Sequence, residues 1–233
     1  MAKIDIGEVR SQLIASQEKL PAEVPHGDGV FLPLNQLGGQ VPIFWCFNNW
    51  VEPLSLAFHL GPDQPLFATR SFHNLLSGKA AKKANVTSLA TLYVEELLGH
   101  YQSGPLILGG NCQAAPVVEA MAHRLLTLDI EVPTLVILEH QLDYFYPGYV
   151  LHLFGAASED YNPFLRGLDP TERWRRQFGA TAWGAIDGKH GQFFRAPAIH
   201  QLCGYLRMTV AACRDGKDLP TGNITNPKSA TEA

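Results

Sequence analysis

A cysteine at the tip of a strand–turn–helix segment is the residue of this chain best suited to chemistry. Cys112 lies in the run Leu-Ile-Leu-Gly-Gly-Asn-Cys-Gln-Ala-Ala (106–115). Gly110 and Ala114, two positions before and two after it, match the small residues of the nucleophile-elbow pattern G-x-S-x-G. Small residues there let strand and helix approach closely while a strained turn exposes the side chain between them. The pattern predicts that Cys112 is a thiol nucleophile in the place usual for serine.

The flanking residues support this interpretation. Residues 106–108 form a short apolar run typical of a buried parallel strand. After the turn, Pro116 is tolerable in a first helical turn. Apolar residues then recur at helical spacing, namely Val117, Val118, Met121, Leu125 and Leu126. The alternative is a small buried cysteine without reactivity, since many cysteines only pack.

Composition narrows the class of protein. The chain has 233 residues, of which 46% are hydrophobic, and a formal net charge of −4. It is long enough for a sizeable core, and it lacks the basic excess of nucleic-acid-binding proteins. No signal-peptide core and no membrane-spanning apolar run is present. The four cysteines have no metal-ligand spacing, so we predict a reduced, cytoplasmic protein without a metal site; they are Cys46, Cys112, Cys203 and Cys213.

Strand-like and helix-like segments alternate along the chain, which predicts an α/β fold with a mostly parallel sheet covered by helices on both faces. Strands are expected at 30–34, 42–47, 66–69, 106–108, 134–138, 149–154 and 182–186. Helices are expected at 6–20, 51–60, 88–101, after Cys112, and at 197–213, with a loop at 71–84. The resulting division is an N-terminal helix and linker (1–28), one domain (29–213) and a polar, disordered tail (214–233).

From about Gly29 to Leu206 the chain resembles a known family. Landmarks in sequence order are Pro-Leu-Asn (33–35), Gly-Gly (38–39), Val-Pro-Ile-Phe (41–44), the turn Leu-Gly-Pro-Asp-Gln-Pro-Leu (60–66), and Leu-Tyr-Val-Glu-Glu-Leu (92–97). They are similar to those of the α/β-hydrolase thioesterase domains, type I-like, that release products from polyketide and nonribosomal peptide assembly lines. The landmarks follow one another in the same order as in that family.

The resemblance implies a triad in the order nucleophile, acid, histidine. Glu139 ends the strand 134–138, where the resembled subgroup places its aspartate, and His190 lies in a loop similar to the family's "G-x-H" loop. Asp160, after the next strand, is the alternative acid, and Asp143 is a weaker one. His140 is expected to be a surface histidine.

The family's oxyanion loop is altered here. The resemblance implies one donor from the backbone N–H of Gln113 and a second from the loop after the strand 42–47. The family usually has a His-Pro-x-Gly-Gly-like sequence at that point, whereas this chain has Cys-Phe-Asn-Asn-Trp (46–50). The second donor is therefore expected from Phe47 or Asn48, with the side-chain amide of Asn48 or Asn49 as a substitute.

A thiol nucleophile changes the expected chemistry. A neighbouring imidazolium lowers a cysteine pKa, so we expect a thiolate–imidazolium pair between Cys112 and His190. The acyl group would stay activated as a thioester, which makes transfer or cyclisation an alternative to hydrolysis. The resemblance implies no cofactor of the enzyme itself. The substrate would arrive on the phosphopantetheine arm of an acyl or peptidyl carrier protein, or as a CoA thioester.

The family's helical lid is predicted to be missing or much shortened, because only residues 140–148 separate Glu139 from the next expected strand. Its role could pass to residues 158–181, which carry Arg166 and the cluster Arg173, Arg175 and Arg176. These arginines are either a solvated face or a docking surface for an acidic carrier protein.

Three other functions stay open. The same Cys-His-acid set could serve an acyltransferase or amide-forming enzyme. The altered oxyanion loop and lid could also mark a noncatalytic hydrolase fold that binds a carrier or partner protein. A hydrolase of oxygen esters or amides is the third.

Overall fold

The computed structural model describes residues 4–24, 27, 29–71, 79–101, 103–130 and 134–225, with the backbone alone for 79–83. The strands are β1 (Leu32–Leu34), β2 (Ile43–Phe47), β3 (Leu66–Arg70), β4 (Ile107–Asn111), β5 (Thr134–Leu138), β6 (Tyr146–Gly155), β7 (Phe178–Ile186) and β8 (Gly222–Ile224). The helices are α1 (Ile6–Gln17), α2 (Val51–Leu60), α3 (Lys79–His100), α4 (Ala115–Leu126), α5 (Thr171–Gln177) and α6 (Ala198–Asp215), with short 3₁₀ turns η2 (Cys112–Ala114) and η3 (Pro163–Arg166).

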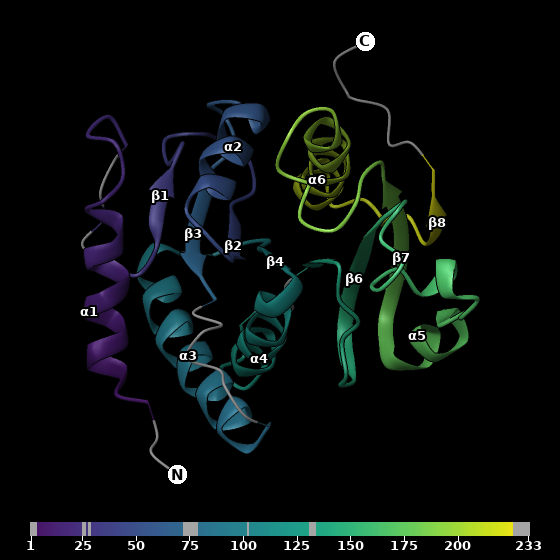
Figure 1. Cartoon of the computed structure of the whole chain (residues 1–233), viewed down its shortest axis with the longest axis horizontal. Helices are drawn as coiled ribbons and strands as arrows, with labels where there is room; N and C mark the ends of the chain where they lie inside the picture. The colour runs from purple at the N-terminus through teal and green to yellow at the C-terminus, as the bar shows by residue number, and fades with distance from the viewer. Residues whose placement is uncertain are drawn as a thin grey trace.

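One eight-stranded sheet organises the described chain, in the order β1-β3-β2-β4-β5-β6-β7-β8. Only the β1–β3 pair is antiparallel, and every other neighbouring pair is parallel. Helices cover both faces, with α2 and α6 on one side and α1, α3, α4 and α5 on the other (Figure 1). The predicted α/β architecture is confirmed.

Side-chain alternation along the strands builds these two cores. In β2, Ile43, Trp45 and Phe47 pack in the core beneath α2 and α6. Phe44 and Cys46 face the opposite core beneath α3 and α4. Every residue of β2 is buried, which is why its sequence is a continuous apolar run.

The structure differs from the sequence-based expectation in two segments. The loop expected at 71–84 is helical from Lys79, where α3 begins; residues 72–78 lie outside the described part. The tail expected to be disordered from residue 214 contains β8, which pairs with β7, and the carbonyl of Pro220 accepts a hydrogen bond from Tyr149. Sheet pairing and burial of Tyr149 order this polar segment up to residue 225, while 226–233 lie outside the described residues.

The parallel strands place several polar residues at one edge of the sheet. Asn48 follows β2, Cys112 follows β4, and Glu139 follows β5. The carboxyl ends of neighbouring parallel strands lie together, and in open α/β sheets ligands bind there.

Candidate active site

The turn after β4 brings Cys112, half-buried, to the wall of a cavity, as the elbow pattern predicts. Its φ of 52° lies in the left-handed region, and η2 and α4 follow at once. A Cβ added to Gly110 would lie 2.7 Å from Val118 Cγ2, so a larger residue would push helix α4 away from the strand. Ala114, on the other side of the cysteine, is fully buried. The sequence therefore fixes the elbow through small residues on both sides of the cysteine.

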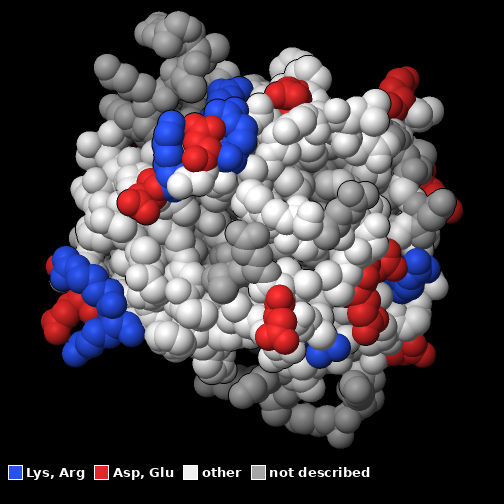
Figure 2. Space-filling view, turned by 180° about the vertical axis from the view of Figure 1, so that it is seen from behind, with Lys and Arg blue, Asp and Glu red and all other residues white. Residues whose placement is uncertain are grey.

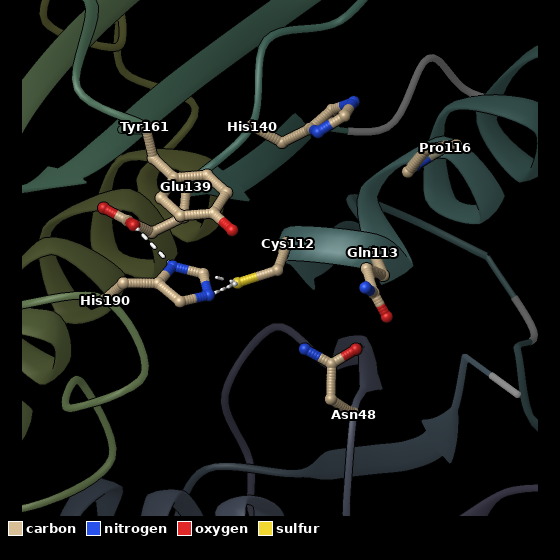
Figure 3. A pocket seen from close by; sticks show the side chains of 8 residues that line it. All are labelled: Asn48, Cys112, Gln113, Pro116, Glu139, His140, Tyr161 and His190. Carbon is tan, nitrogen blue, oxygen red and sulfur yellow. Dashed lines mark hydrogen bonds and ion pairs between the residues drawn. The ribbon is translucent and has the colours of Figure 1, made fainter. Parts of the chain in front are cut away.

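His190 lies directly beside the thiol, although it comes from the loop that follows β7. Its Nε2 is 3.7 Å and its Nδ1 3.8 Å from Cys112 Sγ (Figure 3). The loop is held locally, since Gln192 Oε1 accepts a hydrogen bond of 3.0 Å from the Lys189 N–H. The imidazole side chain is 39% exposed, so a substrate can reach it.

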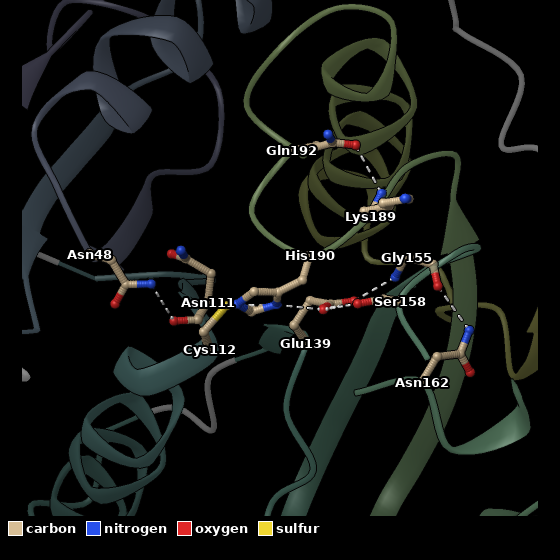
Figure 4. Close-up of polar contacts among 10 residues, drawn as sticks. All are labelled: Asn48, Asn111, Cys112, Glu139, Gly155, Ser158, Asn162, Lys189, His190 and Gln192. Carbon is tan, nitrogen blue, oxygen red and sulfur yellow. Dashed lines mark hydrogen bonds and ion pairs between the residues drawn. The ribbon is translucent and has the colours of Figure 1, made fainter. Parts of the chain in front are cut away.

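Glu139 completes a line of three side chains. Its Oε2 is 2.8 Å from His190 Nδ1, while the carboxylate itself is fully buried. Two further donors fix it: the Gly155 N–H to Oε1 and the Ser158 hydroxyl to Oε2, both at 2.6 Å (Figure 4). With Nδ1 occupied by the acid, Nε2 is the ring nitrogen that faces the thiol.

The alternative acids lie elsewhere. Asp160 is exposed and makes no hydrogen bond or ion pair with other residues in the described part of the chain. The backbone N–H of Asp143 donates to Glu119, and its side chain is exposed. Only Glu139 of the three is in contact with His190.

Three predicted oxyanion residues have different surroundings. Gln113 and Asn48 line the cavity next to Cys112, whereas Phe47 is fully buried in the core and does not line it. The N–H of Gln113 lies in the first turn of a helical segment, where backbone donors have no helical acceptor. Helix N-termini also favour negative charge, so this N–H is well placed for a developing oxyanion.

The candidate for the second oxyanion donor is the side-chain amide of Asn48, not its backbone N–H. The N–H of Asn48 donates to Glu52 Oε2 at 3.1 Å, so it points away from the cavity. The Asn48 side chain faces the cavity near Cys112 (Figure 3). Its Oδ1 accepts from the Ser71 hydroxyl at 3.1 Å and its Nδ2 donates to the Asn111 carbonyl at 3.3 Å. Nδ2 carries two protons, so one stays available toward the cavity.

Glu52 is a site residue that the sequence did not reveal. It lies in the first turn of α2, and its Oε2 also accepts from Asn111 Nδ2 at 3.3 Å. Asn111 Oδ1 in turn accepts from the indole N–H of Trp45. Burial raises the pKa of the Glu52 carboxyl, against the lowering effect of the hydrogen bonds from Asn48, Asn111 and Asn49. An acid in the first turn of a helix is a common feature, so its sequence position carried no functional signal.

The thiol pKa differs from the expected lowering. Burial raises the pKa of the Cys112 thiol to about 12, and the negative charges of Glu139 and Glu52 add to the rise. Desolvation disfavours a thiolate, and two carboxylates repel it. A thiol with a raised pKa keeps its proton at rest, so this proton must be transferred as Sγ attacks.

The cavity around these groups measures about 420 Å³. Its lining residues are Asn48, Cys112, Gln113, Pro116, Glu139, His140, Tyr161 and His190. His140, expected at the surface, is half-buried at the cavity wall. Tyr161 is a second residue without a sequence signal: its ring stacks on that of His190, with centroids 3.9 Å apart and planes at 10°.

The predicted loss of the lid is confirmed. Residues 139–145 join β5 to β6 without a helix. In the segment 158–181, η3 and α5 pack on the sheet, and Tyr161 is the one residue of this segment that lines the cavity.

The arginines of α5 lie near the edge of the molecule. Arg173, Arg175 and Arg176 are exposed, and basic side chains gather with acidic ones where α5 lies, as they do in other patches of the same face (Figure 2). Arg176 forms an exposed ion pair with Glu172, and Arg173 donates to Gln141.

Among the described residues, no group of three or more His, Cys, Asp or Glu side chains could hold a metal ion. Within the same residues, no helix combines the length and apolarity needed to cross a membrane.

Comparisons with known proteins agree with this architecture. No protein-family model matches the chain. Chondramide synthase cmdD of Chondromyces crocatus is 34% identical over 117 residues; the match covers 46% of this chain, which spans only 3% of that synthase.

Solved structures extend the likeness to most of the chain. The NocB thioesterase domain of the nocardicin cluster has a TM-score of 0.61 at 16% identity, covering 78% of this chain and 99% of that one. The Vlm2 thioesterase domain has a TM-score of 0.56 at 12% identity (74% and 94%), and YbtT, a type II thioesterase of the yersiniabactin pathway, 0.55 at 13% (78% and 96%). The fold is thus the α/β-hydrolase fold of thioesterase domains from natural-product assembly lines.

Proposed function

We propose that the protein is a thioesterase-type enzyme that takes an acyl or peptidyl group from a carrier-protein or CoA thioester onto Cys112. The observation that carries the proposal is the continuous line from Cys112 Sγ through the imidazole of His190 to the buried carboxylate of Glu139. The thioesterase fold of its structural relatives supports the same type of activity.

The first half-reaction uses each group once. As Sγ attacks the substrate carbonyl carbon, its proton passes to His190 Nε2, and Glu139 stabilises the imidazolium. The carbonyl oxygen becomes an oxyanion held by the Gln113 N–H and Asn48 Nδ2. Collapse breaks the bond to the leaving sulfur, which takes the proton from His190 and departs as the pantetheine or CoA thiol.

The second half-reaction sets hydrolysis against transfer. A thioester on Cys112 is as activated as the incoming one, so water, an amine or a hydroxyl can each take the acyl group. His190 removes the proton of the acceptor as it attacks and returns it to Sγ. Structures of the Vlm2 thioesterase domain carry depsipeptides of four and twelve units, which supports an extended acyl chain here.

The carrier would dock beside α5. Arg173, Arg175 and Arg176 present positive charge to solvent, and clustered arginines steer acidic partners. Charge reversal at these three positions should raise KM for a carrier-bound substrate by about tenfold and leave a pantetheine thioester unaffected.

The decisive experiment is a search for the acyl-enzyme. The protein is mixed with an acyl-pantetheine thioester, and intact mass and peptide mapping locate the adduct. We expect an adduct on Cys112 that is absent in Cys112→Ala and retained in Cys203→Ala, whose buried cysteine is the matched control. No adduct together with unchanged thiol release in Cys112→Ala would reject the proposal.

Matched oxygen esters separate the ester-hydrolase alternative, because such an enzyme would turn them over at least as fast as the thioester. Added amine or alcohol acceptors separate transfer from hydrolysis through the product formed. Binding of a carrier without any turnover or adduct would support the noncatalytic alternative.

A further inference from the structure

One turn between β6 and η3 contacts both Glu139 and His190, the other two members of the candidate triad. This turn, residues 156–162, is called the clamp turn below. Its Ser158 hydroxyl donates to Glu139 Oε2 at 2.6 Å, and its Tyr161 ring stacks on the His190 ring at 3.9 Å. The acid and the base of the candidate triad are therefore both held by a single short segment.

The clamp turn is itself well fixed. The Ser158 carbonyl accepts hydrogen bonds from the N–H groups of Tyr161 at 3.1 Å and Asn162 at 2.8 Å. The Asn162 side chain donates to the Gly155 carbonyl at 3.0 Å, which ties the turn to the end of β6 (Figure 4). The Gly155 N–H also donates to Glu139, so the turn and the acid share one anchor.

The orientation of the imidazole needs such support. Both ring nitrogens of His190 lie at nearly equal distances from Cys112 Sγ, 3.7 and 3.8 Å, so how directly Nε2 points at the thiol depends on the orientation of the ring. A hydrogen bond to Glu139 fixes one edge of the ring but leaves its plane free to tilt. The nearly parallel Tyr161 ring, at 10°, removes that freedom.

The stack also favours the charged form of the base. An aromatic face attracts a cation through its quadrupole, and His190 becomes a cation when it takes the thiol proton. The Tyr161 ring covers one face of the imidazole and keeps water from it. No helix between β5 and β6 covers the site in its place. Tyr161 is 42% exposed, so its own far side faces solvent rather than a core it must fill.

We propose that Tyr161 is a positioning residue that holds the plane of His190 and stabilises its imidazolium, and that it acts as a unit with Ser158. This inference rests on the proposed function, because it concerns the base of the same reaction. The Tyr161 ring would then be a fourth side chain of the site, which supports the three of the triad.

The main test compares two variants at the same position. Tyr161→Phe keeps the ring and should keep kcat within about twofold for an acyl-pantetheine thioester. Tyr161→Leu removes the ring and should lower kcat about tenfold, with KM within about threefold, because an exposed or part-buried cation–π contact is of that size. Tyr144→Leu is the matched control, since Tyr144 is 53% exposed and its aromatic neighbour is His123 instead.

A double-mutant cycle tests whether Ser158 and Tyr161 act together. If Ser158 and Tyr161 act together, the double variant Ser158→Ala/Tyr161→Leu should lose clearly less than the product of the two single losses. Fully multiplicative losses would overturn the coupling. An unchanged kcat in Tyr161→Leu, an equal loss in Tyr161→Phe, or a loss confined to KM would overturn the positioning role.

A spectroscopic readout separates this inference from the proposed function. The ring current of Tyr161 should shift the Hε1 proton resonance of His190 upfield, as assigned with a His190→Gln variant. The shift should persist in Tyr161→Phe and vanish in Tyr161→Leu. Absence of the shift in the wild type would refute the stack even if turnover is normal. A normal shift in a protein that forms no acyl adduct would confirm the stack and count against the proposed thioesterase-type function.

Discussion

Replacing Glu139 by glutamine gives the sharpest test of the candidate triad. The amide has two orientations. With its oxygen toward the Gly155 N–H, its NH₂ group faces His190 Nδ1 and the Ser158 hydroxyl, and every group finds a partner. That orientation donates to Nδ1 and so moves the ring proton to Nε2, 3.7 Å from Cys112 Sγ. A protonated Nε2 cannot accept the thiol proton.

The magnitude follows from the cost of the other orientation. Turning the amide oxygen toward His190 places an NH₂ group against the buried Gly155 N–H, and an unsatisfied buried donor costs about 1–3 kcal/mol. The variant also loses the charge that stabilises the imidazolium, which is worth about 1.5–3 kcal/mol. Together they predict a fall in kcat of roughly 100- to 10,000-fold. Stability should change by no more than about 1 kcal/mol, because a buried charge is removed while its contacts persist.

The assay is thiol release from an acyl-pantetheine thioester, with thermal unfolding measured in parallel. Asp160→Asn is the matched control, since Asp160 is the alternative acid on sequence grounds and is exposed in the structure. We expect that control to retain full activity. Activity of Glu139→Gln within threefold of wild type, or an equal loss in Asp160→Asn, would refute the assigned acid.

Three further perturbations address the supporting structure. Gly109→Ala should destabilise the fold by roughly 1–3 kcal/mol or more in denaturant titrations, because the new Cβ would overlap the indole of Trp45; unchanged stability would contradict that packing. Glu52→Gln removes a negative charge that raises the pKa of Cys112, so iodoacetamide should alkylate this thiol faster at pH 9, and a slower reaction would oppose the electrostatic account. Burial raises the pKa of Glu119 from 4.5 to about 7, so the wild type loses stability as pH rises through that window. Glu119→Gln keeps an oxygen for the two N–H groups now bound by Oε1, and it should stabilise the protein more at pH 8 than at pH 5; a gain independent of pH would be the wrong result.

The elbow and the sheet were predictable because their signals are local. Gly110, Cys112 and Ala114 fall within five residues, and the small side chains report directly on a close strand–helix approach. Continuous apolar runs such as β2 report burial on both faces. The polar tail gave the opposite signal, yet β8 forms, because pairing with β7 supplies hydrogen bonds that composition does not reveal.

The candidate site was only partly predictable. His190 and Glu139 followed from family resemblance and strand ends, but their contact distances depend on loops that meet at one sheet edge. Tyr161 and Glu52 had no signal, since nothing in a sequence states which ring stacks on a histidine or which carboxylate binds a loop N–H. The prediction of a lowered thiol pKa was wrong for a related reason: burial and the charges of Glu139 and Glu52, which are far from Cys112 in the sequence, raise it.

The sequence alone determined the candidate nucleophile and the parallel sheet, because these rest on short-range spacing and on hydrophobic runs, while the order of the triad candidates came from the family resemblance. The tertiary structure decided which acid contacts His190, which Asn48 donor faces the cavity, and how readily Cys112 ionises. Those properties depend on distances and solvation among residues far apart in the chain, which arise only once the strand ends are brought together.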